Sequence, residues 1–313
     1  MPTFPSRRLA ALITGASLVV LAGCGGSSDS DSGGSPSQSP AAASAIPVVT
    51  STNVYGDIVG QIGGTKVDVT SIISDPDQDP HSYEANTQNQ LALSKAKVVV
   101  ENGGGYDDFV DRMLKSAGNS SAEVINAVKV SGRTAPKGGE LNEHVWYDFP
   151  TVAKIADRIA AALGKVDPAN AATYTKNADA FKADLKPLEA KEAQIKKEHG
   201  GEAIAITEPV PLYMTGASGL VDKTPAEFSE AIEEGDDVSP KVLQETLALF
   251  TDKQVEALVY NAQTSGPQTE KSEQAAKASG IPVVPVTETL PSGKNYLAWM
   301  TGNVDALANA LAK

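Results

Sequence analysis

Residues 167–201 read DPANAATYTKNADAFKADLKPLEAKEAQIKKEHGG, and this segment organises the interpretation of the whole chain. Asp167-Pro168 is a helix start, with Asp as the cap and Pro at the first helical position. Apolar side chains then recur on one side of a helix that ends at Gly200-Gly201. They are Tyr174, Ala178, Phe181, Leu185, Leu188 and Ile195. A helix over 169–199 is about 45 Å long at 1.5 Å per residue. Pro187 lies inside it and predicts a kink or an early break.

Strands and helices alternate on both sides of this segment. The predicted strands are 46–51, 67–73, 97–100, 123–126, 203–207, 255–261 and 282–286. The predicted helices are 53–63 and 87–96, with Asn53 and Thr87 as caps, then 106–117, 148–163, 239–250, 268–279 and 304–311. Such alternation is typical of an α/β fold with mostly parallel sheets. We therefore predict two similar lobes joined by one long rigid helix, with a ligand cleft between the lobes at the carboxyl ends of the strands.

The N-terminus has the pattern of a secretory signal. Arg7 and Arg8 precede an apolar stretch over 9–22 that is too short to span a bilayer stably. Residues 21–24, Leu-Ala-Gly-Cys, resemble the lipobox of bacterial lipoproteins, in which the cysteine is acylated and becomes the mature N-terminus. Cys24 is the one cysteine of the chain, which excludes a disulfide framework and a thiolate metal cluster.

These patterns predict the domain organisation. A signal peptide over 1–23 is followed by the acylated cysteine and a flexible tether rich in Gly, Ser, Pro and Ala over 24–45. An N-terminal lobe over 46–166, a linking helix over 167–200 and a C-terminal lobe over 201–313 complete the chain.

Composition narrows the classes of function. The chain of 313 residues has a formal net charge of −13, so it lacks the basic surface with which proteins bind nucleic acid. Aromatic residues make up 5%, which disfavours a site that stacks on sugars. No arginine follows Arg158, which disfavours an anion clamp in the second lobe.

Four side chains in loops are candidate metal ligands. His81 follows the second predicted strand, and His144 precedes a predicted helix. Glu208 and Glu288 follow the strands 203–207 and 282–286, so each lobe supplies two candidates. Neutral imidazoles with carboxylates suit Zn²⁺ or Mn²⁺ and suit thiophilic ions poorly.

Each of these positions also has an ordinary explanation. A loop histidine beside a proline is usually a surface residue, and a glutamate at a strand end is often solvated or caps the next helix. We interpret His199 as a residue that interacts with the dipole at a helix end, and leave it out of the site. Only the joint placement of the four candidates at strand ends favours a metal site.

The sequence around these candidates resembles a known family. The motifs are Asp79-Pro80-His81-Ser82-Tyr83-Glu84, Glu143-His144-Val145-Trp146-Tyr147-Asp148, Thr207-Glu208-Pro209 and Thr287-Glu288-Thr289-Leu290-Pro291. From about Val48 to its C-terminus, the chain is similar to the adhesin-type zinc/manganese solute-binding lipoproteins of ABC transporters. The resemblance implies a metal ion held in the cleft, delivery of that ion to an ABC permease, and a monomer anchored to the extracytoplasmic face of the cell membrane through Cys24.

Three departures from the family pattern bear on the metal. Glu288 stands where the family commonly has Asp, and Glu208 stands where many zinc-selective members have His. The histidine-rich loop of many zinc members is absent, since 132–141 holds no histidine. These features favour Mn²⁺, whereas sites with nitrogen and oxygen donors bind Zn²⁺ more tightly than Mn²⁺. The choice between Zn and Mn stays open.

Three other functions are compatible with the pattern. A metal-dependent hydrolase needs an open coordination position and a general base, and the sequence has no His-Glu-x-x-His, nucleophile elbow or phosphate loop. A surface adhesion lipoprotein would use the metal only structurally, and a related binding protein would carry a different small solute. We predict binding rather than catalysis, with local loop movement rather than wide closure because the long helix limits hinge opening.

Overall fold

Parallel strands form two sheets in the computed structural model, which describes residues 45–75, 83, 86–137 and 139–312. The predicted signal peptide, Cys24, nearly all of the tether and His81 lie outside these residues. The first sheet has the order β2-β1-β3-β4, with β1 (Ile46–Thr52), β2 (Val67–Ile73), β3 (Val98–Glu101) and β4 (Glu123–Asn126). The second has the order β6-β5-β7-β8, with β5 (Ala203–Ile206), β6 (Val221–Asp222), β7 (Leu258–Asn261) and β8 (Val283–Val286). Every pairing is parallel, and both sheets lie in one compact unit, Ser44–Lys313.

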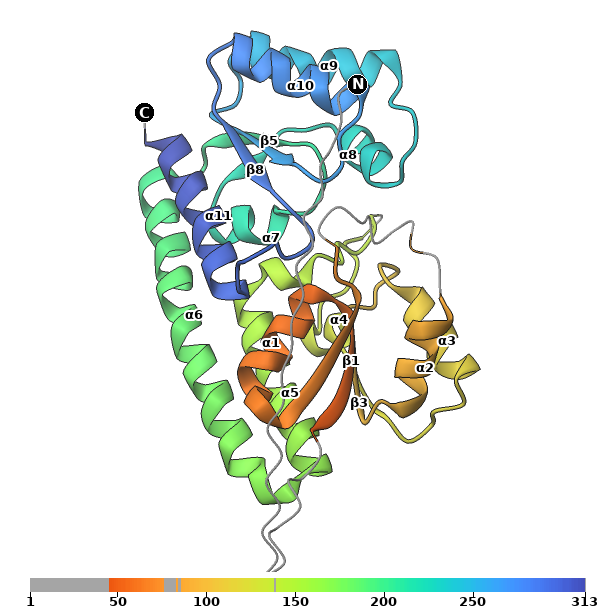
Figure 1. The fold of residues 1–313 in the computed structure, drawn as a ribbon. Helices are drawn as coiled ribbons and strands as arrows, with labels where there is room; N and C mark the ends of the chain where they lie inside the picture. The colour runs from red at the N-terminus through yellow and green to blue at the C-terminus, as the bar shows by residue number, and fades with distance from the viewer. Residues whose placement is uncertain (1–44, 76–82, 84–85, 138, 313) are drawn as a thin grey trace, which may run out of the picture. The chain divides into compact units, whose positions relative to one another are not determined.

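Both faces of the first sheet are covered by helices (Figure 1). Val48, Val98 and Val100 point to the side of α1 (Asn53–Gly63) and α5 (Phe149–Val166). Val49 and Val99, one residue out of step, pack against α2 (Thr87–Lys95) and α3 (Asp108–Ser116). Successive side chains of a strand point to opposite faces, so burial of both faces explains the continuous apolar run of β3.

The second sheet is covered in the same way. Ala205 and Leu258 pack against α9 (Pro240–Thr251) and α10 (Pro267–Ala278). Their strand neighbours Ile204 and Val259 share the main core with α7 (Leu212–Ala217) and α11 (Tyr296–Leu311). A separate small core holds α8 (Ala226–Glu233) to the start of α9.

The long helix α6 (Ala171–His199) packs against α5 and α1 of the first half and against α11 and α7 of the second (Figure 1). The six apolar side chains predicted to share one face are all buried. The predicted early break at Pro187 is wrong, because the helix continues through that residue, whereas the predicted kink stays a prediction. Pro187 and Ala183, whose carbonyl loses its helical partner, are both exposed, so water can satisfy that carbonyl while the buried face stays packed. Two parallel sheets and this long connecting helix confirm the predicted fold class.

Several local predictions are wrong. Thr52 rather than Asn53 is the N-cap residue of α1, and the side chain of Asn53 makes other hydrogen bonds. Asn86 rather than Thr87 caps α2, because its side chain accepts a hydrogen bond from the backbone N of Asn89. The last helix begins at Tyr296 rather than Val304. Elements without a prediction are α4 (Ala127–Ser131), α7, β6 and α8, with the short 3₁₀ helices η1 (Gly64–Lys66) and η2 (Val145–Tyr147). The predicted start of the long helix is instead a separate 3₁₀ turn, η3 (Pro168–Asn170). These segments are short, and periodicity needs several turns to be visible.

Buried and partly buried hydrogen bonds join the two halves directly. The side chain of Asn53 donates to the carbonyl of Leu290 and accepts from its N–H, both at 2.9 Å. Tyr147 Oη donates to the carbonyl of Thr287 at 2.7 Å, and Tyr296 Oη donates to the carbonyl of Trp146 at 2.6 Å. The halves are therefore tied by polar bonds as well as by the apolar core that they share.

Candidate metal-binding site

Three of the four candidate ligands lie in the described residues, and all three are buried. His144 is 0% exposed, Glu208 2% and Glu288 3%. Glu208 and Glu288 follow β5 and β8, and the carboxyl ends of parallel strands meet at one edge of a sheet. His144 directly precedes η2, which leads into α5. The fourth candidate, His81, stays a prediction.

Asn261, the last residue of β7, brings the two carboxylates together. Its Nδ2 donates to Glu208 Oε2 at 2.5 Å and to Glu288 Oε1 at 2.8 Å. Asn261 itself is 1% exposed, and its Oδ1 accepts a hydrogen bond from the backbone N of Gln263. Two buried carboxylates therefore accept hydrogen bonds from one amide group. The negative charge of the two carboxylates would also stabilise a cation beside them.

Gln263 fixes the loop that carries Glu288. Its Oε1 accepts from the backbone N–H groups of Glu288 and Thr289, at 2.6 and 3.0 Å. Its Nε2 donates to Thr289 Oγ1 at 2.5 Å. One glutamine side chain thus holds the turn after β8 at three points.

Asn142 orients the imidazole of His144. Asn142 Nδ2 donates to the carbonyl of Pro209, so Oδ1 is the end of that amide facing His144 Nδ1, at 2.8 Å. This arrangement assigns the ring proton to Nδ1 and makes Nε2 the atom with a lone pair for a metal ion. The group that orients this imidazole is therefore the carboxamide of Asn142 rather than a neighbouring carboxylate.

Aromatic side chains line the histidine. The ring of Trp146 lies 5.0 Å from that of His144 and the ring of Tyr106 lies 6.0 Å from it, both edge-on. Tyr106 Oη donates to Glu288 Oε2 at 3.4 Å, which connects the first half of the chain to the carboxylate pair. Buried aromatic side chains thus contact both His144 and Glu288.

Glu233, at the end of α8, lies beside His144. Its Oε1 is 3.5 Å from His144 Nε2, and one donor atom each from Glu143, His144 and Glu233 lie within 4.8 Å of one another. Burial, and then the charges of Glu143, Glu208 and Glu288, raise the pKa of Glu233 to about 9. Burial likewise raises the pKa of Glu143 to about 7.

The sequence interpretation missed Asn261 and Glu233. Asn261 ends the predicted strand 255–261, so its position at a carboxyl end was a usable signal. Glu233 has no such signal, because α8 lay outside every predicted element.

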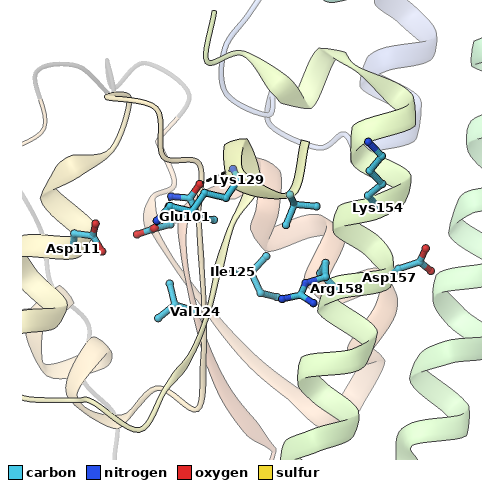
Figure 2. A pocket seen from close by; sticks show the side chains of 10 residues that line it. Glu101, Asp111, Val124, Ile125, Lys129, Lys154, Asp157 and Arg158 are labelled. Carbon is cyan, nitrogen blue, oxygen red and sulfur yellow. Dashed lines mark hydrogen bonds between the residues drawn. The ribbon is translucent and has the colours of Figure 1, made fainter. Parts of the chain in front are cut away.

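A groove of about 720 Å³ lies between α3 and α5 along the edge strand β4 (Figure 2). Asp111 on α3 and Arg158 on α5 face it from opposite sides, with Glu101 between them. Its lining mixes lysine, arginine and acidic side chains and includes no histidine. The chemistry of a transition-metal site therefore favours the buried cluster around Asn261 over this groove.

Comparisons with known proteins agree with the fold. The family model described as ZnuA, zinc-uptake complex component A periplasmic, matches residues 48–310. The metal ABC transporter substrate-binding lipoprotein SloC of Streptococcus mutans is 26% identical, with 86% of this chain and 90% of SloC covered. The manganese-binding lipoprotein MntA of Bacillus subtilis is 27% identical, with 79% of this chain and 81% of MntA covered.

Solved structures show the same architecture. The periplasmic zinc-binding protein TroA from Treponema pallidum superimposes with a TM-score of 0.72 at 21% identity, covering 86% of this chain and all of TroA. A zinc-bound deletion mutant of ZnuA gives a TM-score of 0.68 at 25% identity, covering 86% of this chain and 96% of that one. Among the described residues, no helix is both long and apolar enough to cross a membrane. The matched segment contains nearly all of the residues that the structure describes, and the chain belongs to the family of ZnuA, the periplasmic component A of zinc-uptake complexes.

Proposed function

We propose that this protein is the extracytoplasmic solute-binding component of an ABC importer, which binds a divalent transition-metal ion and delivers it to the membrane permease. The ligands proposed are His81, His144, Glu208 and Glu288. The observation that carries the proposal is the buried carboxylate pair on Asn261, to which His144 is linked through Tyr106, whose ring lies 6.0 Å from that of His144 and whose Oη donates to Glu288. Family membership and relatives named as metal-binding lipoproteins support it.

The ligand set suits the ion electrostatically. Two buried carboxylates in one site repel each other, and a divalent cation between them converts that repulsion into attraction. Two neutral imidazoles add nitrogen donors without further charge. Zn²⁺ and Mn²⁺ both fit, and the names of the relatives include both metals.

Catalysis is not part of the proposal. A catalytic zinc site keeps one position open for water, whereas four protein ligands fill a tetrahedral site. The family is named for uptake, which agrees with binding and release. Hydrolysis that depends on the added metal would instead favour the hydrolase alternative.

The protein is expected to act at the membrane surface as a monomer. Acylation of Cys24 would anchor it on the extracytoplasmic face, and the tether over 24–45 would leave the metal-binding unit free to meet the permease. SloC and MntA are both named as lipoproteins, which supports this anchoring.

Metal exchange in this proposal needs only local movement. The bonds of Asn53 to Leu290 and of Tyr147 to Thr287 would all break in a wide hinge opening. Loops such as the turn after β8 can move without breaking the shared core. A rigid-body rotation between metal-free and metal-bound structures would contradict this.

Calorimetric titration of Zn²⁺ and Mn²⁺ into the demetallated protein tests the proposal. We expect binding at one ion per chain, weakened at least about tenfold in His81→Ala and in Glu288→Ala. The control is His199→Ala, because His199 pairs with Glu202 at the end of α6. Absence of binding, or full affinity in both site variants, would refute the proposed site.

A further inference from the structure

We propose that Glu233 supplies an additional carboxylate oxygen to the same metal ion as His144, and that this ligand biases the site toward ions such as Mn²⁺ that accept more than four ligands. This inference rests on the proposed function. It adds a ligand from α8 to the four candidates found at the strand ends and beside η2.

The first support is the separation of the two donor atoms. His144 Nε2 and Glu233 Oε1 are 3.5 Å apart. Two donors that each lie about 2.1 Å from one ion at a tetrahedral angle are about 3.4 Å apart. The observed spacing is therefore compatible with one ion shared by the two donors.

The second support is the way α8 places this side chain. Phe228 and Ile232 are buried in the small core that holds α8 against Val238. This packing sets the direction of Glu233, whose side chain is 12% exposed, while the next residue, Glu234, is exposed. A glutamate is rarely buried unless it is paired or binds a metal ion, and Glu233 lies against His144.

The third support is the convergence of negative charge. Glu208 and Glu288 are both close enough to Glu233 to act on it electrostatically, as is Glu143. A site with three carboxylates around one cation is costly to assemble without that cation. Among the described residues, the donor atoms that lie within 4.8 Å of one another belong to Glu143, His144 and Glu233, and Glu208 and Glu288 act on Glu233 from outside that group.

The preference for the ion follows from coordination chemistry. Zn²⁺ in protein sites of this kind is nearly always four-coordinate, so His81, His144, Glu208 and Glu288 already complete its shell. Mn²⁺ accepts six ligands and suits carboxylate oxygen. A fifth protein donor therefore stabilises bound Mn²⁺ more than bound Zn²⁺.

The experiment titrates Mn²⁺ and Zn²⁺ separately into the full chain and into three variants. Glu233→Gln removes the charged donor at constant shape, and Glu233→Asp keeps the charge but shortens its reach. Glu234→Gln is the matched control, because it removes the same charge one residue away on the exposed side. Circular dichroism of each metal-free variant verifies that the fold is retained.

We expect Glu233→Gln to weaken Mn²⁺ binding by at least about tenfold and Zn²⁺ binding by less, with Glu234→Gln within about threefold of the parent. Glu233→Asp is expected to weaken Mn²⁺ binding as well, which separates ligation from a general effect of charge. Unchanged affinity in Glu233→Gln, or full affinity in Glu233→Asp, overturns the inference and leaves the proposed function intact. Tighter binding in Glu233→Gln would instead show that Glu233 only shares a proton with His144. Failure of the parent chain to bind either ion overturns both.

Discussion

Replacement of Asn261 by Asp tests whether one amide stabilises the metal-free site. Asn261 Nδ2 donates to Glu208 Oε2 and Glu288 Oε1, at 2.5 and 2.8 Å. Asp has the same shape but presents an oxygen in place of the NH₂ group. The variant therefore loses both donated hydrogen bonds and sets a third carboxylate against two that are 2% and 3% exposed.

The expected cost follows from these contacts. A hydrogen bond to a charged group contributes about 1.5–3 kcal/mol, so the loss of two such bonds lowers the free energy of unfolding by about 3–6 kcal/mol. That is a large share of a total stability of about 5–15 kcal/mol. For a unit of this size, we expect the melting temperature of the metal-free protein to fall by roughly 6–20 °C.

Bound metal should reverse much of this loss. A divalent cation satisfies all three carboxylates, and a ligand that binds only the folded state stabilises it in proportion to its affinity. The assay is thermal unfolding of the variant and the parent, each without metal and with saturating Mn²⁺. Asn309→Asp, on the exposed side of α11, is the control for the added charge. The reasoning fails if Asn261→Asp loses no more stability than Asn309→Asp, or if metal leaves its deficit unchanged.

Three further changes test the packing that supports the site. Burial, and then the charges of Asp148 and Glu189, raise the pKa of Glu192 to about 8. The folded state therefore favours the protonated carboxyl group more than the unfolded state does. This contribution to the free energy of unfolding is fully present at low pH and is lost as pH rises from about 4 to about 8. Glu192→Gln should thus raise the free energy of unfolding by up to roughly 4 kcal/mol at pH 8 and should leave it nearly unchanged near pH 4. Urea titrations at the two pH values measure this difference, and an equal gain at both would contradict the prediction. Phe181→Ala should lower the free energy of unfolding by about 3–5 kcal/mol in the same titrations, because Phe181 is 3% exposed and lies in the main core. A loss below about 1 kcal/mol would mean that α6 does not depend on the packing of this face. Asn53→Ala should cost about 1–3 kcal/mol through its two bonds to the backbone of the second half, and an unchanged urea midpoint would refute that role.

The parts of the fold that the sequence predicted are those with long periodic signals. The buried face of α6 repeats over about six turns, so Tyr174 through Ile195 could be assigned from spacing alone. The strand 46–51 begins as an apolar run, and the strand 67–73 ends before Ser74, Asp75 and Pro76, which are typical turn residues. Glu208 and Glu288 could be selected because a parallel sheet brings its carboxyl ends to one edge.

The remainder depends on contacts between residues far apart in the chain. Nothing local to Asn53 indicates that its side chain binds the backbone of Leu290, 237 residues away, instead of capping a helix. Glu233 belongs to an eight-residue helix that is held by a small core of its own, and its proximity to His144 arises only when the two halves meet. Short elements and long-range polar pairs leave no periodic trace in a sequence.

Uncharged carboxamides hold the candidate ligands, and this suits a protein that must release what it binds. Asn142 orients His144, Asn261 joins Glu208 to Glu288, and Gln263 holds the turn of Glu288. A carboxylate in the place of Asn142 would raise the basicity of the imidazole and tighten its bond to the metal. An amide fixes the same orientation with less electron donation, and an amide donor to a carboxylate reduces the charge that this carboxylate offers to the ion. The arrangement therefore selects geometry without maximising affinity, as a carrier requires when its cargo has to pass on to a permease.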